Sequence, residues 1–169
     1  QSVKEEILFA NYNFTNIISN RAKGIKSELN LLEKYLLRQD LEPKQILDFA
    51  LDGRKKYDEF YFLTPEGDVV FSTQSEIKDD YLQFFKSKPW QNKAYVKDGF
   101  YYSKFDFSDI TNPVRFIAKE LDNGSILVAK VKFDFIYKYL AALNKNKDIQ
   151  NLIIGLDGKI LFHNDMKMV

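Results

Sequence analysis

Three runs of apolar, β-branched and aromatic residues between positions 100 and 133 limit the possible folds more than any other feature of this sequence. The runs cover residues 100–107, 114–121 and 126–133, and polar turns of six and four residues join them. A parallel connection needs a crossover of about a dozen residues or more, so these strands must pair as antiparallel neighbours. The second turn contains Asn123-Gly124, a dipeptide typical of hairpins.

The first 38 residues have the pattern of one long helix. They contain no proline and one glycine, and their apolar positions recur at steps of three, four or seven, which is the spacing of one helix face. These positions are Ile7, Phe14, Ile18, Ile25, Leu29, Leu32 and Leu36. At about 1.5 Å per residue the helix would span roughly 55 Å, more than a small domain needs. Two compatible interpretations follow: the helix covers a core, and it also pairs with a second copy of itself.

Shorter helices are predicted at 44–55, after the helix-starting Pro43, at 79–85, and at 133–143. A short turn is predicted at 90–96, before Asp98-Gly99. A hairpin is predicted from strands 57–63 and 69–73, because Pro65 and Gly67 occupy the positions that a turn favours. Helices covering an antiparallel sheet define the α+β class, which we predict for this chain.

The tail repeats the pattern of the first hairpin about 90 residues later. Residues 151–156 and 159–163 form an apolar run, an Asp-Gly turn and a second apolar run. The pattern favours an internal repeat of a whole module. A chance likeness between two Asp-Gly hairpins is the alternative interpretation.

Composition removes several functional classes. The chain has 25 basic and 24 acidic residues, interleaved, and its net charge is +1, so we expect no nucleic-acid partner. It has no cysteine and a single histidine, His163, which excludes thiolate chemistry and leaves almost no material for histidine metal sites or catalytic triads. We therefore predict no catalytic residue, no metal and no cofactor. Aromatic residues are abundant, with 15 Phe and 10 Tyr, and they can build a core, line a pocket or do both.

The order and spacing of several motifs resemble the double Cache (PAS-like) sensor domains of bacterial membrane receptors. These motifs are the long helix, the hairpin segment Phe-Leu-Thr-Pro-Glu-Gly-Asp-Val-Val-Phe-Ser-Thr (62–73), Lys-Pro-Trp (88–90), and the strand segments at 101–107, 116–118 and 126–131. The resemblance implies a membrane-distal Cache module at 1–147 and the beginning of a membrane-proximal module at 148–169. It also implies an extracytoplasmic location, with membrane anchors in flanking segments outside this chain. We expect the chain to be a piece cut from a longer receptor.

The same resemblance implies ligand-binding positions. In the amino-acid-binding branch, a basic residue and an aromatic pair hold the ligand carboxylate, and Lys88 and Trp90 match those positions. Lys88 replaces an arginine, and Gln91 stands where that branch has tyrosine. Asp106 or Asp109 is the candidate for the carboxylate that binds the amine. The plainer interpretations are a solvated Lys88 and a Trp90 that packs on the sheet.

Strand alternation predicts the faces of the other candidate residues. Tyr101 and Phe105 would share one face, while Tyr102 and Asp106 would share the other. A buried Asp106 needs a partner, either a ligand or a cation, whereas an edge-strand Asp106 would face water. We expect Arg115 to form an ion pair across the turn with Asp106 or Asp109.

The sequence therefore predicts a sensor module and not an enzyme. Its ligand would be an amino acid, carboxylate or amine, bound between the sheet and residues 79–105, and residues 7–36 would form a homodimer contact. The alternative is a PAS-like protein-interaction domain without a small-molecule ligand.

Overall fold

The structure is a computed structural model, and it describes most of the chain. The described residues are 3–38, 40–52, 56–109, 111–135 and 137, together with two short strands at 152–154 and 160–162. The division of the chain near residue 147 lies outside this described part.

A six-stranded antiparallel sheet forms the centre of the fold. Its strands are β1 (Tyr57–Leu63), β2 (Val69–Ser72), β3 (Val96–Lys97), β4 (Phe100–Tyr102), β5 (Val114–Glu120) and β6 (Ile126–Lys132). The order across the sheet is β2-β1-β6-β5-β4-β3. Every adjacent pair is antiparallel, and pairing of β1 with β6 attaches the first hairpin to the last strand of the sheet. The predicted antiparallel meander and first hairpin are therefore confirmed.

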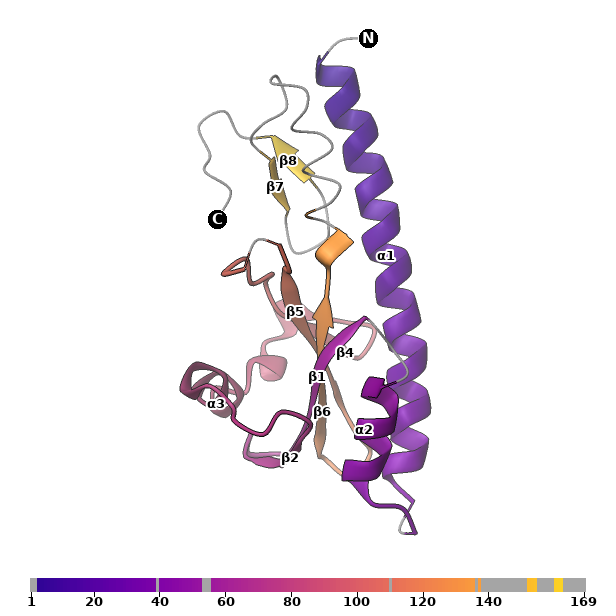
Figure 1. Ribbon diagram of the computed structural model, residues 1–169, viewed down its shortest axis with the longest axis vertical. Helices are drawn as coiled ribbons and strands as arrows, with labels where there is room; N and C mark the ends of the chain where they lie inside the picture. Colours follow the sequence, from indigo (N-terminus) through magenta and orange to yellow (C-terminus); the bar gives the residue numbers. More distant parts are fainter. Residues whose placement is uncertain are drawn as a thin grey trace.

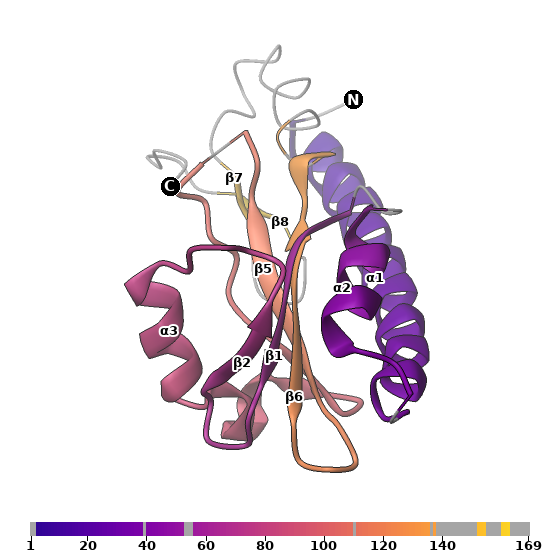
Figure 2. The ribbon, with the colours of Figure 1, turned by 60° about the horizontal axis from the view of Figure 1, so that its bottom comes forward.

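Helices cover both faces of this sheet. The long helix α1 (Val3–Leu36) and α2 (Pro43–Asp52) lie on one face, and α3 (Asp79–Lys86) lies on the other, as Figures 1 and 2 show. Short 3-10 turns at Pro89–Gln91 and Lys93–Tyr95 follow α3. A long helix packed on a PAS-like sheet confirms the predicted α+β class.

The core consists of two apolar clusters, one on each face of the sheet. The α1-face cluster includes the predicted helix residues Ile18, Ile25, Leu29 and Leu36, all buried, with Leu32 packed against it. The side chains of Ile7 and Phe14 lie outside the described part. The α3-face cluster is built by residues that alternate with those of the first cluster along the same strands. Its buried members are Tyr61, Leu63, Phe85, Tyr101, Phe116, Ala118, Ile126 and Val128.

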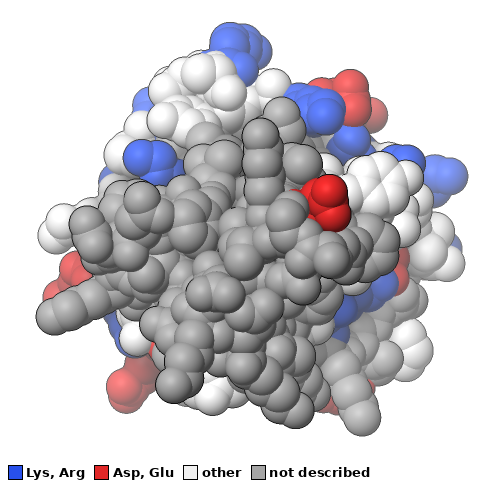
Figure 3. Space-filling view, turned by 90° about the horizontal axis from the view of Figure 1, so that it is seen from above, with Lys and Arg blue, Asp and Glu red and all other residues white. Residues whose placement is uncertain are grey.

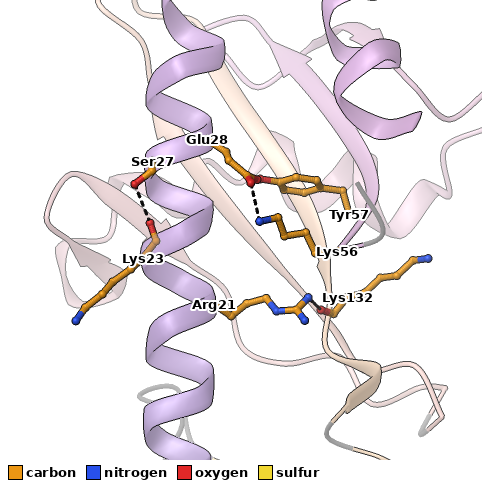
Figure 4. A network of polar contacts seen from close by, with 7 residues as sticks. All are labelled: Arg21, Lys23, Ser27, Glu28, Lys56, Tyr57 and Lys132. Carbon is orange, nitrogen blue, oxygen red and sulfur yellow. Dashed lines mark hydrogen bonds and ion pairs between the residues drawn. The ribbon is translucent and has the colours of Figure 1, made fainter. Parts of the chain in front are cut away.

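Polar contacts attach the middle of α1 to the ends of two strands, β1 and β6. Tyr57 donates a hydrogen bond to Glu28, which also pairs with Lys56 at 2.6 Å. About two turns earlier on α1, Arg21 donates to the carbonyl of Lys132 at 3.1 Å. Figure 4 shows these contacts reaching from α1 to the beginning of β1 and the end of β6. The helix is thus attached to two neighbouring strands of the sheet, β1 and β6.

The C-terminal strands β7 (Leu152–Ile154) and β8 (Ile160–Phe162) pair as an antiparallel hairpin. This confirms the predicted tail hairpin. Of the helix predicted at 133–143, Asp134, Phe135 and Tyr137 are helical, and the other positions after Phe133 lie outside the described part.

Two strand predictions need correction. The strand predicted at 100–107 ends at Tyr102 and is followed by an isolated bridge between Asp106 and Val114. The segment predicted as a turn at 90–96 holds two 3-10 turns and leads into β3, which pairs with β4 through the two-residue turn Asp98-Gly99. Both turn residues have positive φ, 55° and 82°, as a type I′ hairpin requires.

Candidate functional site

The candidate site is a cavity of about 510 Å³ on the α3 face of the sheet. It lies between α3, the segment that carries the 3-10 turns, and strands β4 and β5. Its lining residues are Asp80, Tyr81, Phe84, Pro89, Asn92, Tyr95, Tyr101, Ser103, Lys104, Asp106, Arg115 and Phe116. The cavity therefore lies between the sheet and residues 79–105, the region in which we predicted that a ligand would bind.

Aromatic rings form much of the cavity wall. Phe116 on β5 contacts the Tyr81 ring edge-on at 5.1 Å and the Phe84 ring in a stacked arrangement at 5.5 Å. Tyr101 adds its ring 6.4 Å from Phe84. These rings hold α3 against the sheet and give the cavity a firm apolar surface.

Asp106 reaches this cavity because of a one-residue insertion in the backbone. Tyr102 pairs with Ile117, so regular pairing would place residue 105 opposite Val114, but Asp106 occupies that position instead. The extra residue forms a bulge, and a shift of one residue exchanges the two faces of a strand. The predicted faces are therefore wrong for Phe105 and Asp106.

As a result, Tyr101 and Asp106 share the cavity, while Tyr102 and Phe105 pack against the α1-face cluster. Phe105 lies edge-on to Phe133 with ring centroids 5.0 Å apart. Neither Tyr102 nor Phe105 lines the candidate site.

Local contacts keep the Asp106 carboxylate ionised. Burial by itself would raise its pKa, but hydrogen bonds from the hydroxyl and backbone N–H of Ser108, with the charges of Lys130 and Lys78, hold the pKa below its usual value. The backbone N–H of Ser108 lies 2.9 Å from Asp106 Oδ1. The carboxylate is thus a fixed negative group at the edge of the cavity.

Arg115 is a buried cation, with a side chain only 4% exposed. Its Nε and Nη2 donate to the Ser103 carbonyl at 3.0 and 2.7 Å, and its guanidinium lies 4.3 Å from the Phe105 ring centroid. The ion pair that we predicted between Arg115 and Asp106 or Asp109, all described residues, does not form. Asp106 instead accepts from Ser108, and Asp109 accepts from Thr111. Burial lowers the pKa of Arg115 to about 10, which leaves it charged at neutral pH.

Lys88 and Trp90, the outer residues of the Lys-Pro-Trp motif, do not line the cavity. Lys88 is half-buried and has a left-handed backbone, φ 51°, directly before Pro89. Trp90 packs partly buried against the α3-face cluster. The structure thus agrees with the plainer interpretation of Trp90 as a packing residue, while Pro89 between them contacts the cavity.

Several lining residues had no role in the sequence analysis. Asp80, Tyr81 and Phe84 come from α3, and Tyr95 and Lys104 come from the segments on either side of the β3–β4 hairpin. The helix at 79–85 was predicted, and the spacing of Tyr81, Phe84 and Phe85 places these rings on one helix face. The sequence therefore contained a signal for the aromatic residues that α3 contributes. The Asp98-Gly99 turn likewise marked the hairpin that brings Tyr95 toward Tyr101.

A second, more apolar cavity of about 420 Å³ lies between α1 and α2. We call it the α1–α2 groove, and its lining includes Leu31, Tyr35, Leu41, Ile46 and Phe49. The Phe49 side chain is 82% exposed, which is unusual for a large apolar ring. The groove is therefore a candidate surface for a protein contact.

The described residues carry few other signs of function. In that part of the chain, no helix combines the length and apolar character needed to cross a membrane. Nor do these residues bring three or more acidic or histidine side chains together as metal ligands. Around the rim of the view in Figure 3, the described residues show groups of both charge signs.

Comparison with known proteins does not identify a family. No family model matches the chain, and no curated protein matches it. Among solved structures, it is similar to the Bacillus subtilis YkuI protein, which has an EAL domain and was solved in complex with substrate c-di-GMP and calcium. The identity is 15% and the TM-score 0.44, and the match covers 80% of this chain and 35% of that one. The chain thus spans about a third of the length of that protein, and a likeness at this level does not bear on function.

Proposed function

We propose that this chain is a ligand-sensing domain whose α3-face cavity binds a small molecule. The observation that carries the proposal is the cavity itself. Its volume of about 510 Å³ falls within the range of roughly 300–1,000 Å³ typical of small-molecule sites. Its lining joins an aromatic wall to a small number of charged groups, which is the usual composition of such sites.

The charges that line the cavity favour a zwitterionic ligand. Lys104 and Arg115 are positive, and Asp80 and Asp106 are negative. A ligand with one carboxylate and one ammonium group can interact with the two positive and the two negative side chains. A simple carboxylate would leave the two aspartates without a positive ligand group, and a simple amine would leave Lys104 and Arg115 without a negative one. An amino acid is therefore the first ligand class to test, followed by carboxylates and amines.

The sensor proposal extends to the Cache-type receptor that the sequence resembles. In that setting the domain lies outside the cytoplasm, and its long helix connects to the membrane through segments beyond this chain. The contacts of α1 with the ends of β1 and β6 support a mechanical link between sheet and helix. A ligand that binds one arrangement of sheet and helix more tightly would shift the population toward it.

A thermal-shift screen against amino acids, carboxylates and amines tests the proposal. A ligand at 100 times its Kd should stabilise the fold by about 2.7 kcal/mol, a rise of several degrees in Tm. A matched pair of variants on α3 then locates the site, since Asp80 lines the cavity and the adjacent Asp79 does not. We expect Asp80→Asn to weaken the ligand response and Asp79→Asn to leave it unchanged. A panel without any stabilising compound would contradict the proposal.

The α1–α2 groove favours a second candidate function, that of a protein-interaction domain. Exposed Phe49 and Leu41 would pack against an apolar helix of a partner protein. If this is the function, no compound in the screen should raise Tm. The Phe49→Asp variant should fold normally and no longer bind the partner protein.

A further inference from the structure

A third cavity lies on the opposite face of the sheet from the candidate site, between α1 and the β3–β4 hairpin. Its volume is about 200 Å³. We call it the hairpin cavity, and its lining residues are Ile18, Ser19, Ala22, Lys23, Lys26, Lys97, Asp98, Tyr102 and Arg115. The proposed sensor function makes no use of it.

The lining of the hairpin cavity is strongly positive. It contains four cationic side chains, from Lys23, Lys26, Lys97 and Arg115, and one carboxylate, from Asp98. Lys26 and Asp98 pair at 2.9 Å, so the one negative group is already engaged by one of the four cations. Like charges that line one small cavity repel one another, and a bound anion would relieve the repulsion.

The fold brings these charges to the cavity from three elements. Arg115 comes from β5, and its buried guanidinium rests between the Tyr102 and Phe105 rings at 5.4 and 4.3 Å. Lys97 is the last residue of β3, and Asp98 is the first residue of the tight turn to β4. Lys23 comes from the side of α1 that faces away from Arg21 and Glu28, as Figure 4 shows.

The cavity also offers neutral hydrogen-bond donors. Ser19 and Tyr102 each bring a hydroxyl group to the lining. Burial raises the pKa of the Tyr102 hydroxyl, so it stays protonated and able to donate at neutral pH. Hydroxyl and ammonium groups are donors that proteins use for phosphate and carboxylate groups. Arg115, whose Nε and Nη2 already donate to the Ser103 carbonyl, adds positive charge to the lining.

We propose that the hairpin cavity binds a small multivalent oxyanion such as phosphate. Its volume is below the roughly 300–1,000 Å³ of sites for drug-sized molecules, which favours an inorganic oxyanion or a compact dicarboxylate over a larger metabolite. This site is distinct from the α3-face cavity, although Arg115 lines both. The proposal therefore stands or fails independently of the sensor function.

Calorimetric titration of the full chain with inorganic phosphate tests the site. The titration is run at about pH 8, where phosphate is mainly a dianion, and sodium chloride keeps the ionic strength constant. The variant is the double substitution Lys23→Gln and Lys97→Gln, because both lysines line the cavity and are exposed. The matched control is Lys34→Gln with Lys44→Gln, which removes the same charge from exposed positions outside the cavity.

We expect saturable binding of one phosphate to the native chain, and Kd about tenfold weaker in the cavity variant but within about twofold in the control. Without phosphate, the cavity variant should melt at the same temperature as the native chain or higher, because it carries less charge repulsion. The proposal is overturned if the native chain shows no saturable binding. Equal weakening in both variants would also overturn it, since that result indicates attraction to net charge alone.

Discussion

At the scale of single residues, Gly67 decides how closely α3 approaches the sheet. It lies in the turn between β1 and β2 with φ 88°, and a Cβ built on it would come within 2.3 Å of the Phe85 carbonyl oxygen. The turn and the end of α3 therefore touch through backbone atoms. Because α3 supplies Tyr81 and Phe84 to the cavity, this contact also sets the shape of the candidate site.

Substitution of this glycine should be much more costly than substitution of a glycine with the same backbone angle in open space. Gly99 is that control, since its φ is 82° and no atom lies within 4 Å of its built Cβ. We expect Gly99→Ala to lower the free energy of unfolding by about 1 kcal/mol, the effect of backbone strain alone. Gly67→Ala should cost about 3 kcal/mol, because strain and overlap add. Chemical denaturation measures both, and equal losses would contradict the close contact.

The buried Tyr101 is expected to make the folding stability of the protein fall at alkaline pH. Burial raises the pKa of its hydroxyl to about 12, from 10.0 in the unfolded chain. Above pH 10 the unfolded chain loses this proton before the folded one, so the tyrosine's contribution to stability is present below pH 10 and declines above it. Arg115 acts in the opposite direction at these pH values, since burial lowers its pKa to about 10.

A comparison with Tyr101→Phe isolates the tyrosine. From pH 8 to pH 11, the native chain should lose about 1.4 kcal/mol more unfolding free energy than the variant. Urea denaturation at the two pH values measures this difference. Parallel losses in both proteins would show that the Tyr101 hydroxyl titrates normally.

The bulge before Asp106 shows where residue-level prediction stops. The sequence shows aromatic and acidic residues in 101–106, and three of the predicted site residues, Tyr101, Asp106 and Arg115, do line the cavity. Which face each residue occupies depends on one extra residue in the backbone, and no glycine or proline in 103–106 signals it. Simple alternation therefore assigned Phe105 and Asp106 to the wrong faces.

At the scale of elements, α1 is held to the sheet by one apolar face. Ile25 is fully buried in that face, whereas Ile17 on the same helix is 43% exposed. The pair allows the same substitution to be compared in two environments. Ile25→Ala should lower the free energy of unfolding by about 3 kcal/mol through lost burial and a cavity, and Ile17→Ala by about 0.5 kcal/mol or less.

Thermal or urea denaturation of the two variants provides the measurement. Similar small losses would mean that α1 is not part of the cooperative fold. That outcome would also remove the mechanical link from sheet to helix that the sensor proposal requires.

Most elements were predictable because their signals are local. The heptad-like spacing on α1, the Pro-Gly turn after β1 and the Asn-Gly turn before β6 each identify an element from a few neighbouring residues. Strand β3 was missed because it is only Val96–Lys97, although the Asp-Gly turn after it was noticed. Pairing of β1 with β6 depends on contacts between residues 63 to 74 apart in sequence, which local patterns cannot specify.

At the scale of the whole molecule, the exposed face of α1 supports the proposed homodimer. Ile17, Leu31 and Tyr35 are apolar or aromatic, and each is more than 40% exposed. Leu31 and Tyr35 also line the α1–α2 groove, so a dimer through this face would cover part of the groove. We expect light scattering at about 100 µM to show a dimer, which exposed apolar surface of this kind favours. Ile17→Asp combined with Leu31→Asp should convert it to a monomer, because each buried charge would lack a partner.

Val70→Asp is the control for the dimer prediction. Val70 is 62% exposed and lies on the edge strand β2, outside α1. This variant should remain dimeric. A native chain that stays monomeric at the highest soluble concentration would contradict the dimer and leave the ligand proposal unaffected.

The central claim is that a small molecule binds the α3 face of the sheet. The measurement that tests it most directly is amide chemical-shift mapping of the isotope-labelled chain during titration with the compounds that stabilise it in the screen. We predict saturable shifts at Tyr81, Tyr95, Tyr101 and Phe116, which surround the cavity. Shifts confined to Leu31, Leu41 and Phe49 would instead place binding in the α1–α2 groove and contradict the claim.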